Sequence, residues 1–156
     1  MNQEVPNTGR LQKNTGEIHI RRCDYYIWAV QGAGRTIVFD SGVRPALADE
    51  RKLGGYVSPD KALTRIGIDA KKAEHLVISH IHFDHGGGIE LFPNAKIYVQ
   101  RKEYDFWVYD PISRRPPYAA VADPVANKQF GDLRGSRIAL YSLMETRRFF
   151  LESSCS

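Results

Sequence analysis

Four side chains of types that bind metal ions lie within six positions of this sequence: His80, His82, Asp84 and His85. Two imidazoles one residue apart can converge only if the loop curls around a common centre, which a metal ion supplies. Asp84 and His85 are adjacent, so they cannot easily point at the same ion as His82. The spacing therefore suggests two ions, one held by the first two histidines and the other by Asp84 and His85.

Three glycines, residues 86–88, follow this cluster and let the backbone turn tightly before a helix starts. They match a phosphate-binding loop poorly, because no Lys-Ser or Lys-Thr pair follows them. The alternative for the whole cluster is a set of surface histidines on a mobile loop, or an accidental chelating patch, but four ligands at this spacing are rarely accidental. His19 and His75 stand alone and are interpreted as ordinary polar residues.

The segments that must position the cluster are rich in β-branched and aromatic residues, which predicts strands at Ile18–Ile20, Tyr25–Val30 and Thr36–Phe39. Glycines at 32 and 34 predict a hairpin turn between the last two of these strands. The third strand ends at Asp40, either a residue that supports the metal loop or an ordinary turn aspartate. The continuous apolar run Leu76–Ile78 is typical of a strand covered on both sides, and His80 lies just past its carboxyl end.

Two helices are predicted around the remaining strand. Ser58 is a candidate N-cap, Pro59 fits the first helical position, and Gly67 can close the helix. Ile97–Val99 is predicted to be a strand, and a helix follows from about Arg101 to Val108, with Tyr104 and Trp107 or Val108 on one face. Prolines then predict loops and short turns, at Pro111, Pro116, Pro117 and Pro124.

The composition sets limits on size, compartment and partners. The chain has 156 residues, room for one domain, and its 42% hydrophobic content is sufficient for a core. Its longest uncharged stretch is ten residues, Tyr25 to Gly34, which predicts no membrane span. The first residues do not resemble a secretory signal and the two cysteines are far apart, so we expect a cytoplasmic protein. Basic residues occur in pairs rather than in a stripe, which favours a small substrate over nucleic acid.

Residues 79–87 resemble the HxHxDH signature of the metallo-β-lactamase superfamily. Residues 38–42 resemble the strand and turn that precede the metal loop in that superfamily, and residues 97–104 resemble the segment that follows it in N-acyl homoserine lactonases. Phe83 within the motif also favours the lactonases, because the RNA-processing nucleases of the superfamily typically carry a small residue there. The similarity covers residues 17–140 and implies an α/β fold, the N-terminal half of an αββα sandwich.

The resemblance implies a hydrolase with two zinc ions, bound in part by His80, His82, Asp84 and His85. A zinc-bound hydroxide would attack a lactone carbonyl and open the ring, with Asp84 as ligand and proton acceptor. The implied substrate is a small ester or lactone, most closely an N-acyl homoserine lactone whose hydrolysis would quench quorum sensing. Other superfamily activities, a glyoxalase II-like thioesterase or an RNA nuclease, are alternatives. Imidazole and carboxylate ligands also suit iron, manganese or cobalt.

The chain departs from this pattern after His85, because no further histidine follows. In the family, a further histidine binds each metal ion and an aspartate bridges the two ions. This sequence offers only two ligands for each ion, fewer than the three protein ligands usual for catalytic zinc. A second hypothesis is therefore a non-catalytic metal-binding fragment that associates with itself or with another chain. We divide the chain into a loose arm (1–16), an incomplete domain (17–140) and an atypical tail (141–156). We expect one face of the domain's sheet to be uncovered, and we hypothesise that the tail is frameshifted.

Overall fold

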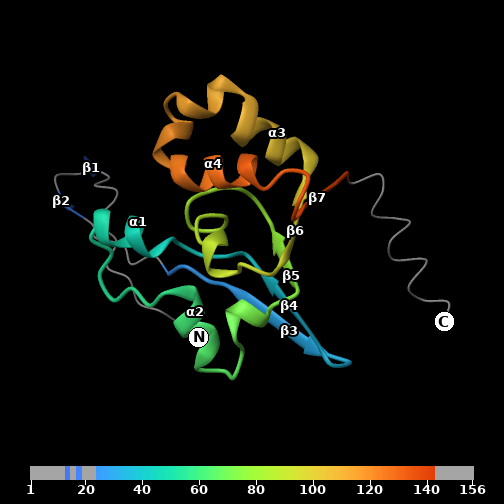
Figure 1. Cartoon of the computed structure of the whole chain (residues 1–156). Coiled ribbons are helices and arrows are strands. Elements are labelled where there is room, and N and C mark those ends of the chain that lie inside the picture. Colours follow the sequence, from blue (N-terminus) through green and yellow to red (C-terminus); the bar gives the residue numbers. More distant parts are fainter. Residues whose placement is uncertain (1–12, 15–16, 19–23, 143–156) are drawn as a thin grey trace.

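The computed structural model describes residues 13–14, 17–18 and 24–142 (Figure 1). Most of the predicted arm and tail, together with His19, lie outside these ranges. Two short strands, β1 (Lys13–Asn14) and β2 (Glu17–Ile18), pair antiparallel with each other. The rest of the described chain forms one sheet with helices, and no helix in it is long and apolar enough to cross a membrane.

Five strands form the main sheet in the order β3-β4-β5-β6-β7. Their bounds are Trp28–Gly32, Arg35–Phe39, His75–Ile78, Lys96–Gln100 and Ile138–Tyr141. The first two form the predicted antiparallel hairpin, and the following pairs are all parallel. The positive φ angles of Ala33 (49°) and Gly34 (74°) close the hairpin turn. The mixed sheet with helices confirms the predicted α/β class.

Four α-helices accompany the sheet: α1 (Pro45–Glu50), α2 (Pro59–Thr64), α3 (Arg101–Tyr109) and α4 (Pro124–Asp132). Short 3₁₀ turns occupy Ala70–Lys72, Ile89–Leu91, Pro111–Arg114 and Tyr118–Ala120. The predictions of α2 and α3 are confirmed. The sequence predicted only loops and short turns around the later prolines, and this is wrong at Pro124, which is the first residue of α4. The N-cap of this helix is Asp123, whose side chain accepts a hydrogen bond from Val125 N.

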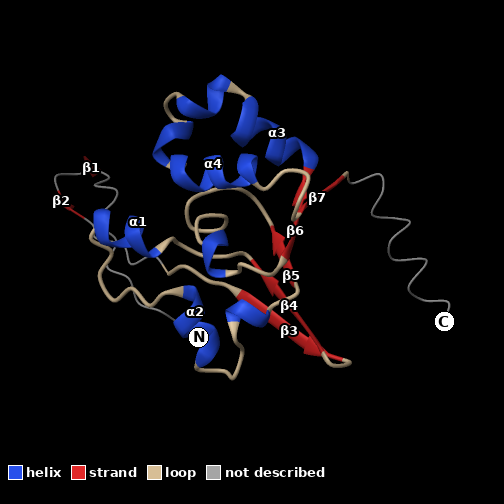
Figure 2. Ribbon diagram, in the orientation of Figure 1, coloured by secondary structure: helices blue, strands red, loops and turns tan. Residues whose placement is uncertain are grey.

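The helices lie on one side of the sheet (Figure 2). The face of the sheet toward the helices is buried. Three neighbouring strands carry Val38, Leu76 and Ile97 at adjacent register positions, and each of these side chains is fully buried. Side chains on the opposite face alternate with these. Trp28 and its cross-strand partner Phe39 lie there, with 66% and 37% of their surfaces exposed. Apart from the β1–β2 pair, the described residues thus form one sheet with one helical layer. The exposed Trp28 and Phe39 agree with the uncovered face that the resemblance led us to expect, at the hairpin end of the sheet.

A buried ion pair ties the loop after β4 to the start of α4. Arg44 Nε and Nη2 donate to the two carboxylate oxygens of Asp123, at 2.9 and 3.2 Å. The two residues are 8% and 1% exposed, so neither charge has water as an alternative partner. This contact links segments 79 residues apart and holds the start of α4 against the loop after β4.

We predict that Arg44→Met lowers the free energy of unfolding by about 3–5 kcal/mol, because it leaves the Asp123 carboxylate buried and unpaired. The control is Lys128→Met, which breaks the exposed pair between Lys128 and Asp132 on α4 and should cost about 0.2–0.5 kcal/mol. Urea unfolding of both variants measures the difference. Losses of equal size would contradict the assigned role of the buried pair.

Candidate metal centre

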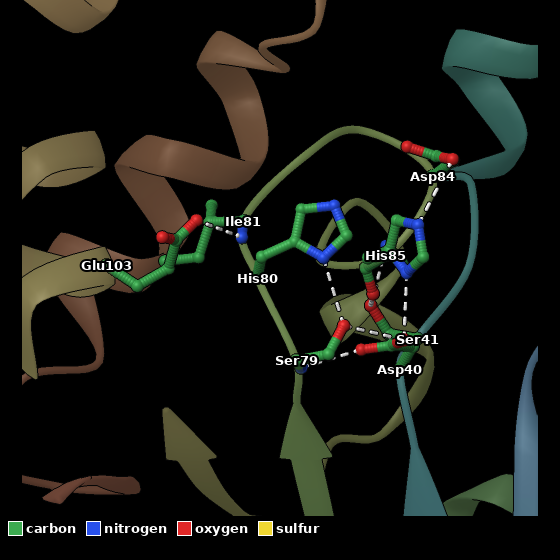
Figure 3. Close-up of polar contacts among 9 residues, drawn as sticks. Asp40, Ser41, Ser79, His80, Ile81, Asp84, His85 and Glu103 are labelled. Atoms are coloured by element: carbon green, nitrogen blue, oxygen red, sulfur yellow. Dashed lines mark hydrogen bonds and ion pairs between the residues drawn. The ribbon is translucent and has the colours of Figure 1, made fainter. Parts of the chain in front are cut away.

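The four predicted ligands lie in the loop at the carboxyl end of β5; Figure 3 shows three of them, His80, Asp84 and His85. Strands β4 and β5 are parallel neighbours, so the residues that follow them, Asp40 and Ser79, meet at the same edge of the sheet. Asp40 N donates to Val77 O at 2.8 Å, and Asp40 takes a left-handed conformation (φ 61°) that turns the chain toward the loop. The sheet thus places a buried carboxylate directly beneath the histidines.

The Asp40 carboxylate holds the start of the loop at Ser79 and its end at His85 by hydrogen bonds. Its Oδ1 accepts from Ser79 N at 2.8 Å, and its Oδ2 accepts from Ser79 Oγ at 2.9 Å and from His85 Nδ1 at 2.8 Å. Because the Ser79 hydroxyl donates to Asp40, it can accept from His80 Nδ1, 3.0 Å away. Both rings therefore use Nδ1 for support, as metal-binding histidines typically do, and the Nε2 of His85 faces the carboxylate of Asp84.

The imidazole rings of the loop gather in one place. The His80 ring centroid lies 3.9 Å from that of His85 and 4.4 Å from that of His82. His85 Nε2 lies 3.3 Å from Asp84 Oδ2. Two donor atoms that share a tetrahedral zinc ion at the usual bond lengths are about 3.3 Å apart, so Asp84 and His85 fit one ion.

The same donors do not form a larger ligand set. Among the residues that the structure describes, no group of three or more His, Cys, Asp or Glu side chains is arranged to hold one ion. The donor types suit zinc, and the separation of Asp84 and His85 suits one shared ion. The assignment of His80 and His82 to a second ion stays a prediction. Of the other histidines, His75 lies apart on β5, where Nδ1 is 3.1 Å from the hydroxyl of Tyr98.

The charges in the loop shift the pKa values of three groups. Burial opposes protonation of His85, but its hydrogen bonds to Asp40 and Asp84 outweigh this and raise its pKa to about 9. Burial, together with the positive charges of His85 and His82, lowers the pKa of His80. Burial raises the pKa of Asp84, but contact with His85 has the larger combined effect and lowers it. The two carboxylates therefore favour the protonated form of His85 at neutral pH.

The glycines after His85 allow the loop to pack on the β4 turn. A Cβ at Gly87 would collide with the carbonyl oxygen of Phe83, and a Cβ at Gly88 with the carbonyl oxygen of Ser41. Ser41 is fully buried; its N and Oγ donate to His85 O at 2.6 and 3.0 Å, and Gly88 N donates to Ser41 Oγ at 3.1 Å. The glycines thus serve close backbone packing, in keeping with the sequence argument against a phosphate loop.

Sequence comparison adds the family. The sequence profile of the Metallo-beta-lactamase superfamily matches residues 20–140, which is most of the chain. The chain belongs to this superfamily. The match includes the hairpin and the loop of the four predicted ligands.

Curated relatives and solved structures narrow the resemblance. N-acyl homoserine lactonase AttM of Azorhizobium caulinodans is 48% identical over 52 residues, 33% of this chain and 19% of that protein. N-acyl homoserine lactonase of Bacillus thuringiensis is 44% identical over 43 residues, 28% of this chain and 17% of that protein. The structure of AidC, a dizinc quorum-quenching lactonase in complex with a product, superposes with a TM-score of 0.65 at 25% identity. The superposition covers 80% of this chain and 45% of AidC.

The chain spans less than half the length of AidC and a smaller share of the matched curated relatives. A second lactonase structure, a quorum-quenching N-acyl homoserine lactone lactonase, has a TM-score of 0.60 at 19% identity and covers 80% of this chain and 47% of that chain. At this identity the likeness concerns the fold.

An aromatic wall flanks the superfamily loop on the side of α1. The Arg51 guanidinium lies 4.0 Å over the ring of Phe83, and the ring of Tyr25 meets Phe83 edge-on at 5.7 Å. Tyr56 packs on the same small apolar cluster and donates to Val43 O at 2.8 Å. Sequence analysis singled out Phe83 but missed its neighbours, because they come from separate segments.

We predict that Gly88→Ala destabilises the chain by about 1–3 kcal/mol, because the new methyl group must displace the Ser41 backbone. Gly32→Ala is the matched control, since a Cβ at Gly32 on β3 meets open space. Thermal unfolding of the metal-free variants measures both. A Gly88 variant as stable as the Gly32 variant would refute the close-packing account.

We predict that the imidazole of His85 titrates near pH 9 in the metal-free protein, well above its ordinary value of 6.5. Because the folded-state pKa is raised, the stabilisation is complete below about pH 6.5 and is lost as pH rises through 9. An NMR pH titration, with the signal assigned by His85→Gln, measures the midpoint. Asp40→Asn should lower it; a wild-type midpoint near 6.5 would contradict the assigned hydrogen bonds.

Proposed function

We propose that this chain is a zinc-dependent hydrolase that opens the ring of N-acyl homoserine lactones. The observation that carries the proposal is the Asp40 network, which turns the supporting nitrogens of His80 and His85 toward the protein. It also places His85 Nε2 3.3 Å from Asp84 Oδ2, a separation that suits two ligands of one ion. The lactonase relatives support the substrate class.

We assign one zinc site to His80 and His82 and a second to Asp84 and His85. Zinc, when bound, would polarise the lactone carbonyl and lower the pKa of water so that it can attack at neutral pH. The chain's own contribution is orientation: Asp40 and Ser79 hold two of the imidazoles, and Ser41 holds the loop backbone. We propose that the carboxylate of Asp84 accepts the proton that the attacking water releases.

The aromatic wall suits the acyl chain of such a substrate. Phe83 lies between two proposed ligands in the sequence, and it packs with the apolar cluster of Val43, Leu47 and Ala48. An acyl chain attached to the lactone ring would gain apolar contact there. Arg51 over the Phe83 ring keeps that ring in place from the side of α1.

We further propose a small-molecule substrate rather than nucleic acid or a membrane surface, and a cytoplasmic location. The scattered basic pairs and the two widely spaced cysteines of the sequence support these choices. Two protein ligands per ion make association with a second copy or another chain a further part of this proposal, because catalytic zinc usually has three.

The first test measures the zinc-to-protein ratio across the size-exclusion peak of the 156-residue chain, and then its hydrolysis of N-hexanoyl homoserine lactone. We expect about two zinc ions per chain in a compact species, and ring opening that stops on zinc removal. His82→Ala should lose zinc and at least 100-fold in rate, roughly the effect of removing one important catalytic group. His75→Ala, a histidine outside the loop, is the control.

Each other outcome identifies a different function. Zinc binding without hydrolysis of lactone, thioester or RNA would establish the metal-binding fragment. Cleavage of RNA with strong salt dependence would establish a nuclease, and thioester cleavage alone a glyoxalase II-like enzyme. Little zinc in the compact species would refute the metal site.

A further inference from the structure

A carboxylate on α3 holds the loop from the side opposite Asp40. Glu103, in the first turn of α3, accepts from Ile81 N at 2.9 Å and from Trp107 Nε1 at 2.7 Å through the same oxygen, Oε1 (Figure 3 shows the first contact). Ile81 is 1% exposed and Trp107 is 3% exposed. Burying a carboxylate costs free energy unless hydrogen bonds compensate, and here one carboxylate oxygen accepts from two buried donors.

Both donors act on the first pair of proposed ligands. Ile81 is the residue between His80 and His82, so its N–H fixes the backbone from which both imidazoles extend. The indole of Trp107 meets the ring of His82 edge-on, with centroids 5.4 Å apart and planes at 89°. Glu103 thereby restrains the backbone of this pair directly and the His82 ring through Trp107.

The supports of the loop are divided between two carboxylates. Asp40 reaches His85 directly and His80 through Ser79, but no hydrogen bond joins it to His82 among the described residues. Glu103 acts on the part of the loop that contains His82. Sequence analysis assigned no role to Glu103, because an acid in the first turn of a helix is common and favourable without any further function.

We propose that Glu103 is a positioning residue that sets the relative placement of His80 and His82, and so tunes metal binding at that pair. This inference rests on the zinc site of the proposed function. Loss of a residue that orients metal ligands typically weakens metal binding 10–100-fold. We expect an effect of that size from Glu103→Ala, and largely restored binding in Glu103→Gln, whose amide oxygen can accept the same two hydrogen bonds.

The test combines a zinc affinity with two signals of the metal-free protein. Zinc competition with a chromophoric chelator gives the affinity of wild type, Glu103→Ala, Glu103→Gln and the control Asp105→Ala, an exposed acid of the same helix. In the metal-free protein, NMR follows the Ile81 amide exchange rate and the Trp107 indole N–H. The chain has two tryptophans, so Trp28→Phe assigns the indole signals.

We expect Glu103→Ala to speed Ile81 exchange, to shift the Trp107 indole signal, and to weaken zinc binding 10–100-fold. Glu103→Gln and Asp105→Ala should stay near wild type. Unchanged exchange and indole signals in Glu103→Ala overturn the inference, as does unchanged zinc affinity. If wild type binds no zinc, the proposed metal site fails, and the metal-free signals alone decide whether Glu103 holds the loop.

Discussion

The site depends on one carboxylate buried at the end of a strand. Asp40 is 6% exposed, and it accepts hydrogen bonds from the backbone and hydroxyl of Ser79 and from His85. A buried carboxylate without these donors would be strongly unfavourable, so β4, β5 and the loop are fixed relative to one another by the need to satisfy it. The parallel pairing of the two strands makes this possible, because it brings residues 39 positions apart to the same edge.

Local sequence patterns predicted the parts of the molecule that local physics determines. The hairpin, the strand β5 and the helices α2 and α3 follow from β-branched runs, turn glycines and apolar periodicity, and the cluster of candidate ligands follows from its spacing. The expectation that β5 is covered on both sides is wrong, because burial alternates along the strand and only Leu76 and Ile78 are fully buried. Ser58 lies at the N-cap of α2 as predicted, but its side chain makes no capping hydrogen bond. The prediction at Pro124 was wrong because proline breaks a helix in its interior but is favoured at the first helical position. The Asp123 N-cap distinguishes the two cases here.

The supports of the site could not be predicted in the same way. Arg44 meets Asp123 across 79 residues, and Glu103 meets Ile81 across 22. Such pairs are chosen by the tertiary fold, and a single sequence does not reveal which acid faces which donor. The role of Asp40, left open between a turn residue and a support of the loop, is decided by its bond to His85. The spacing thus predicted four candidate ligands, whose role stays a prediction, while most residues that orient them could not be predicted.

The closeness of the four proposed ligands in sequence has a thermodynamic consequence. Because they lie within six consecutive positions, an unfolded chain carries the same donors near one another and can also chelate metal. Metal ions stabilise a fold only by the difference between their affinities for the folded and unfolded states. In this chain that difference comes from the carboxylates and the serine that orient the rings, since the donors themselves are present in both states. Zinc would therefore stabilise the fold by less than its total binding free energy.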